Sequence, residues 1–139
     1  MMSSLIDRLI QQYQYPLLDA ENYSHFIFAH DYTVLFFPGD PVQFPESNDV
    51  AVILPELLKV FNQPVNAAVV GAGIERELQR QFRFSRWPAL VFLKQGEYLG
   101  AMTGIHNWND YLTEGAQILN APVSEPPPFD LDKLCQTSH

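Results

Sequence analysis

The fold is decided by the stretch Arg86-Trp87-Pro88-Ala89-Leu90-Val91-Phe92-Leu93-Lys94-Gln95-Gly96-Glu97-Tyr98-Leu99-Gly100. The apolar run Ala89–Leu93 predicts a buried strand, and a second strand ending at Gly100 follows a tight turn at Lys94–Glu97. Pro88 fits the first residue of the hairpin, because proline cannot donate a hydrogen bond to a sheet. Its peptide bond is either trans, the commoner case, or cis, which proteins accept almost only before proline.

This stretch resembles the C-terminal half of thioredoxin, where an isoleucine and a cis proline precede a buried strand, a Lys-Asn-Gly-Glu turn and an edge strand. Thr33–Phe37 resembles the central strand of that family, Ala51–Leu58 the long helix kinked by a proline, and Trp108–Leu119 the terminal helix. The resemblance covers about residues 15–120. It implies an α/β, thioredoxin-like fold with a mixed central β-sheet flanked by helices on both faces.

Apolar spacing predicts the remaining elements. They are a helix over residues 4–12, a short edge strand over 15–18, a helix over 20–30, a helix over 49–61, a strand over 65–70 and a helix over 74–82. Prolines dominate the chain after Leu119, which predicts an extended acidic tail. We therefore expect one thioredoxin-like domain over residues 1–120 and a flexible tail over residues 121–139.

Composition limits the function. The chain has 139 residues, 47% of them hydrophobic, which is enough for one domain with a core. The formal net charge of −8 disfavours nucleic acid and anionic membranes and favours cationic partners, although solubility alone also explains such a balance. No apolar stretch approaches the roughly 20 residues of a membrane helix, and the first residues do not resemble a secretory signal. We expect a cytoplasmic protein.

The loop after the central strand lies where thioredoxins carry their Cys-X-X-Cys motif. The matching positions are Ser47-Asn48-Asp49-Val50, and Phe36 matches the buried carboxylate that assists the second thiol. Thiol exchange needs an attacking thiolate and a resolving sulfur, and both are missing. The resemblance therefore predicts a scaffold that is not an enzyme. Ser47, Asn48 or Asp49 is expected to cap the helix that follows.

Other chemistry lacks support in the sequence. Gly71-Ala72-Gly73 begins like a dinucleotide-binding turn, but Arg76 takes the place of the third glycine, so a tight turn before a helix is expected. The scattered His25, His30 and His106 predict no metal site. We expect no cofactor. The cluster Arg76, Arg80, Arg83 and Arg86 is either a solvated helix face or a surface for a partner.

A narrower family resemblance is carried by Phe36–Pro41 and by Ser85–Phe92 around the proline. Together with the missing cysteines and the overall size, these residues resemble the HyaE/HupG/HoxO accessory proteins of nickel-iron hydrogenase operons. The resemblance implies a cytoplasmic chaperone. Its ligand would be the hydrogenase small-subunit precursor with its twin-arginine (Tat) signal peptide, whose export it delays until the subunit is assembled.

In such a fold, the loop before the kinked helix and the segment before the proline form one groove, where an extended peptide can add a strand. Trp87 and Pro88 would hold the peptide backbone and its apolar part. Acidic residues of the loop would select the cationic part through charge-assisted hydrogen bonds. The predicted partner-binding residues are Asp40, Glu46, Ser47, Asn48, Asp49, Trp87 and Pro88.

Two alternatives remain open from the sequence. One is an adaptor that binds folded hydrogenase or other maturation proteins, through the arginine-bearing face or the tail, without recognising signal peptides. The other is a thiol redox protein that uses Cys135, the single cysteine, in a mixed disulfide. The sequence does not decide between the signal peptide and the mature subunit as the main ligand.

Overall fold

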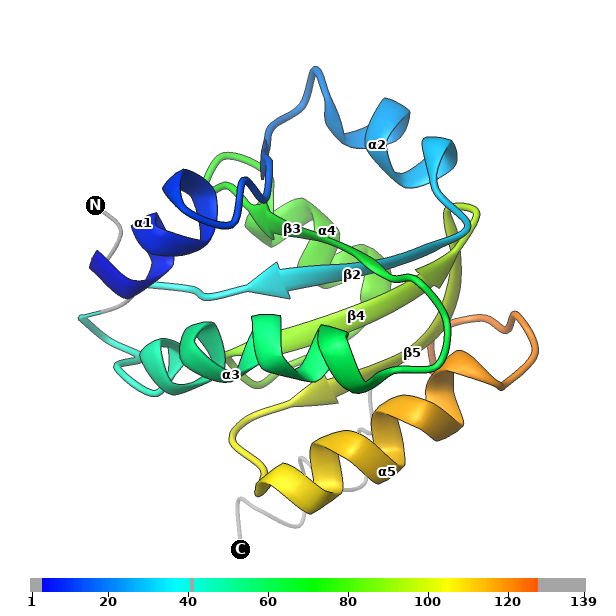
Figure 1. Ribbon diagram of the computed structural model, residues 1–139. Helices are drawn as coiled ribbons and strands as arrows, with labels where there is room; N and C mark the ends of the chain where they lie inside the picture. Colours follow the sequence, from blue (N-terminus) through cyan, green and yellow to red (C-terminus); the bar gives the residue numbers. More distant parts are fainter. Residues whose placement is uncertain (1–3, 41, 128–139) are drawn as a thin grey trace, which may run out of the picture.

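Five strands form a mixed sheet in the computed structural model, which describes residues 4–40 and 42–127 (Figure 1). Their spatial order is β1 (Leu17–Leu18), β3 (Asn66–Val70), β2 (Tyr32–Phe37), β4 (Ala89–Lys94) and β5 (Glu97–Thr103). Strands β1, β3 and β2 are parallel, whereas β4 runs antiparallel to both β2 and β5. This is the thioredoxin-like arrangement expected from the sequence.

Helices cover both faces of this sheet, as predicted. They are α1 (Ser4–Gln11), α2 (Tyr23–Ala29), α3 (Ser47–Val60), α4 (Glu75–Phe82) and α5 (Trp108–Leu119). Each face of the sheet has its own hydrophobic core, and successive residues of β2 point into different cores. Phe36 packs in a cluster with α1, α3 and α5, whereas Phe37 packs in a cluster with α2 and α4. In Figure 1, α3 and α5 lie in front of the sheet and α4 lies behind it.

The predicted hairpin is present. Gln95 and Gly96 have φ angles of 48° and 82° and join β4 to β5, which begins at Glu97. Glycine is required in this turn, because a Cβ at Gly96 would also run into the ring of Phe28. The Trp87–Pro88 peptide bond is cis, and the Pro88 carbonyl accepts a 2.8 Å hydrogen bond from the Gly104 amide.

Several element boundaries differ from the sequence prediction, among them the end of β5, which continues to Thr103 where the prediction ended the strand at Gly100. The edge strand is confirmed but shortens to Leu17–Leu18, which pairs with β3 alone among the described strands. The next helix begins at Tyr23 and not at Ala20, because the Asp19 carboxylate accepts the Glu21 and Asn22 amides at 2.8 and 2.9 Å and holds a turn. The third helix begins two residues earlier than predicted, at Ser47.

The predicted cap of this helix is wrong. The capping position is Glu46, and its side chain makes no capping hydrogen bond. Successive turns lead from the loop into the helix: the amides of Ser47, Asn48 and Asp49 donate to the carbonyls of Phe44, Pro45 and Glu46. The three predicted capping residues therefore already lie within the first helical turn.

The predicted role of Cys135 and the part of the predicted tail after residue 127 lie outside the described residues. Among the described residues, no helix is both long and apolar enough to cross a membrane.

Candidate functional site

The loop after β2 folds back onto the segment that precedes β4. Gly39 has a φ of +68°, and a Cβ there would lie 2.9 Å from the Phe44 ring and 3.2 Å from the Trp87 ring. These two rings stack, with centroids 6.2 Å apart and planes inclined by 30°. Glycine is needed at position 39 both for its backbone conformation and for the close approach of the rings.

The Trp87 side chain is half-buried and packs on two aromatic rings of the core. It meets Phe84 and Phe37 edge to face, with centroid distances of 5.1 and 6.2 Å. Within the described ranges, the backbone of residues 85–87 takes part in no backbone-to-backbone hydrogen bond. Residues 85–87, next to the buried Pro88, thus keep backbone donors and acceptors for an added strand.

A pocket of about 350 Å³ opens between this loop and α4. Its walls combine two stacked aromatic rings with carboxylates and amides: Gly39, Asp40, Gln43, Phe44, Glu75, Arg76, Gln79 and Trp87. Of the residues predicted from the sequence, Asp40 and Trp87 meet here. The structure therefore joins a predicted acidic residue to the predicted aromatic platform and adds groups from α4.

Glu75, like Gln43, Phe44 and Gln79, is a pocket residue that the sequence does not predict. It is half-buried at the start of α4 and accepts a hydrogen bond from the Gly39 backbone. Burial raises the pKa of its carboxyl group, the Gly39 hydrogen bond and the Arg76 charge lower it, and the Asp40 charge raises it. The topology could have indicated this residue. Strands β2 and β3 are adjacent and parallel, and the segments that follow such strands, here those with Gly39 and Glu75, meet at one edge of the sheet.

Glu75→Gln is expected to make stability less dependent on pH. Because the folded-state pKa of Glu75 is raised above 4.5, the stability linked to this group is present below that value and lost as pH rises through the folded-state pKa. The variant has no ionisable group at this position. Its unfolding free energy should therefore increase relative to that of the wild type as pH rises. Urea unfolding at several pH values measures the difference. Glu77→Gln, at an exposed position of the same turn, controls for charge; a difference that does not vary with pH would contradict the assignment.

The other predicted residues lie along the start of α3. Glu46 and Asp49 are exposed, Asn48 is half-buried, and Ser47 is fully buried with no hydrogen-bond partner for its hydroxyl among the described residues. Asp49 lies near Tyr111 of α5, whose pKa is raised by burial and, to a smaller extent, by the Asp49 charge. In the first turn of α3, Asp49 also stabilises the helix dipole. Ser47 is out of reach of a partner in this conformation.

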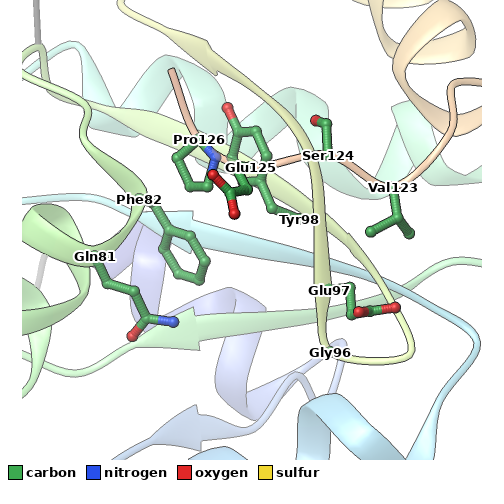
Figure 2. Close-up of a pocket in the computed structure, with 9 residues that line it drawn as sticks. All are labelled: Gln81, Phe82, Gly96, Glu97, Tyr98, Val123, Ser124, Glu125 and Pro126. Atoms are coloured by element: carbon green, nitrogen blue, oxygen red, sulfur yellow. The ribbon is translucent and has the colours of Figure 1, made fainter. Parts of the chain in front are cut away.

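A second hollow, of about 410 Å³, lies beside the hairpin turn (Figure 2). Residues 123–126 border it and are held to the domain, since the Ser124 amide donates to the Tyr98 carbonyl and Arg83 donates to the Pro126 carbonyl, each at 2.9 Å. Figure 2 shows Phe82, Tyr98 and Pro126 toward one end, with Glu97 and Val123 toward the other. We call residues 121–127 the strap. One member of the arginine cluster, Arg83, thus holds the strap.

Within residues 4–40 and 42–127, no group of three or more His, Cys, Asp and Glu side chains is placed to hold a metal ion.

Known proteins resemble this chain over most of its length. The sequence model of one family, described as Hydrogenase-1 expression protein HyaE, matches residues 5–111. The hydrogenase expression/formation protein HoxO of Azotobacter vinelandii is 46% identical over 119 residues, which are 86% of this chain and 80% of that protein.

Solved structures agree with the sequence matches. The crystal structure of the hydrogenase expression/formation protein HupG from Rhodopseudomonas palustris superposes with a TM-score of 0.53 at 39% identity, over 75% of this chain and 94% of that one. Reduced desulfothioredoxin from Desulfovibrio vulgaris superposes with a TM-score of 0.60 at 20% identity, over 74% and 96% of the two chains. The latter likeness shows the fold alone.

Proposed function

The chain belongs to the HyaE family of hydrogenase expression proteins, and from this membership and the pocket beside Trp87 we propose that it is a non-catalytic chaperone of nickel-iron hydrogenase maturation. It binds the hydrogenase small-subunit precursor in the cytoplasm through the twin-arginine signal peptide. Binding delays export until the subunit is assembled. The support comes from the family and from the chemistry of one surface.

The observation that carries the proposal is that three features suited to peptide binding lie together at Trp87. Backbone groups of residues 85–87 lack backbone partners within the described chain, beside an aromatic ring and a pocket with the acidic residues Asp40 and Glu75. An extended peptide can pair with the free backbone groups and lay apolar side chains on the ring. Carboxylates at the end of this segment favour a peptide with neighbouring arginines.

The start of α3 supports a binding role over a redox role. At the position where thioredoxins place the first thiol, the Ser47 hydroxyl is buried and inaccessible. Phe36, at the position of their buried carboxylate, is fully enclosed by apolar side chains of the core. A serine hydroxyl cannot take part in thiol exchange.

Isothermal calorimetry with a small-subunit signal peptide tests the proposal. We expect saturable binding that weakens with salt, and weaker binding of a peptide whose two arginines are lysines. The variant Asp40→Asn with Glu46→Gln should reduce both the affinity and its salt dependence. Absence of binding to either peptide would contradict the proposal, and unchanged affinity of the double variant would remove the acidic loop as the selector.

The alternative is an adaptor that binds its partner through residues 128–139. The strap allows these residues to be removed without disturbing the domain. Deleting residues 128–139 leaves the Ser124 and Arg83 hydrogen bonds in place, so the folded domain should be undisturbed. We expect the peptide affinity of this truncated protein to stay within about twofold of the wild type, a difference below about 0.5 kcal/mol. A large loss of affinity would instead favour an adaptor that works through its last residues.

A further inference from the structure

We propose that the pocket between the loop after β2 and α4 is a subsite for a single arginine side chain, with Glu75 and Asp40 pairing with the guanidinium and Trp87 and Phe44 providing its stacking wall. The inference rests on the proposed function, because the arginine is one of the pair in the signal peptide. It goes further by assigning the selectivity to Glu75, a residue of α4.

The two carboxylates have acceptor capacity to spare. One carboxylate oxygen of Asp40 accepts a 3.0 Å hydrogen bond from the Val42 amide, and the Glu75 carboxylate accepts a hydrogen bond from the Gly39 backbone. An ionised carboxylate offers about four lone-pair sites, so each group can still receive guanidinium hydrogens. Asp40 and Glu75 line the same pocket, and the Asp40 charge contributes to the raised pKa of Glu75. A bound cation would relieve this repulsion.

The aromatic wall favours arginine over lysine. Phe44 and Trp87 stack at 6.2 Å and both line the pocket, so a planar guanidinium can lie against an aromatic face while its edge meets the carboxylates. A lysine ammonium is a point charge and makes no bidentate pair. The volume of about 350 Å³ falls at the small end of ligand pockets, about 300–1,000 Å³, which suits one side chain.

Arg76 is the residue that opposes binding of a second guanidinium in this pocket. It is exposed at the rim of the same pocket and its charge acts on Glu75. An incoming guanidinium therefore competes with Arg76 for the carboxylate. This competition predicts that Arg76→Gln tightens binding of a guanidinium, which a merely acidic surface far from Arg76 would not show.

N-acetyl-arginine amide and N-acetyl-lysine amide, titrated separately into the full chain and followed by NMR, test the subsite. We expect saturable shifts of the Trp87 indole and the Gly39 amide with the arginine probe and at least about fivefold weaker binding of the lysine probe. Glu75→Gln should weaken arginine binding about tenfold, and Arg76→Gln should strengthen it. Glu97→Gln, which removes the same charge at the other hollow, should change nothing.

Equal binding of both probes, or unchanged binding to Glu75→Gln, would overturn the subsite. The same variants titrated with the signal peptide separate the two proposals. A peptide that binds wild type and Glu75→Gln equally would overturn the subsite and leave the chaperone proposal standing. A protein that binds the arginine probe selectively and no signal peptide would support the subsite and overturn the proposed function.

Discussion

Phe36→Asp is expected to lower the unfolding free energy by more than about 5 kcal/mol at pH 7. Phe36 is 0% exposed in β2, where it pairs with Val69 of β3 on one side and Leu90 of β4 on the other. Loss of the ring costs about 3–5 kcal/mol, and a carboxylate without a partner adds its desolvation. The chain is thus built around an aromatic residue where thioredoxins use a proton acceptor.

The pH dependence of this variant identifies the cause. Burial would raise the folded-state pKa of the new carboxyl group above its unfolded value of about 3.9, so the destabilisation should be smallest near pH 4 and grow as pH rises. Phe36→Leu is the matched control, with an expected cost of about 1–2 kcal/mol that does not vary with pH. Urea unfolding at pH 4 and 7 measures both. A cost for Phe36→Asp below about 2 kcal/mol at pH 7 would show that the core admits a charge at this position.

Trp87→Ala is expected to weaken signal-peptide binding by at least about 100-fold, which is close to 3 kcal/mol. The variant removes the platform on which the apolar part of the peptide rests and the wall of the arginine pocket. Calorimetry gives the affinity. Because Trp87 also packs on Phe37 and Phe84, the variant will lose stability, and circular dichroism must show that it is folded at the temperature of the titration.

Phe61→Ala separates this binding effect from a general loss of stability. Phe61 is also half-buried, but it packs on Phe92 and against Gly115 in the other core, on the α5 side of the sheet. Its truncation should lower stability to a similar extent and leave peptide affinity unchanged. If both variants lost the same affinity, Trp87 would act through the fold and not through contact with the peptide.

Much of the fold could be predicted from the sequence, because its strands carry strong local signals. The continuous apolar runs of β2 and β4 require burial on both faces, and the Gln95-Gly96 turn fixes the hairpin between β4 and β5. The start of α3 was harder to place, because backbone turns at Phe44–Glu46 begin the helix without a side-chain cap.

The candidate site could be predicted only in part, because three of the eight residues that line the pocket belong to α4. Asp40 and Trp87 were found from the family resemblance, whereas Glu75 belongs to α4 and reaches the pocket through its bond to the Gly39 backbone. The strap likewise depends on tertiary partners. Nothing in the proline-rich sequence itself indicates its two hydrogen bonds to the domain. In these, the Ser124 amide donates to the Tyr98 carbonyl and Arg83 donates to the Pro126 carbonyl.

The measurement that tests the central claim most directly is an NMR titration of the isotope-labelled full chain with a hydrogenase small-subunit signal peptide. The account predicts saturable shifts confined to residues 39–44, 75–79 and 85–89, which salt weakens. Shifts that avoid these segments and cluster elsewhere, for example on the strap or on α1, would contradict binding at Trp87 and the pocket beside it.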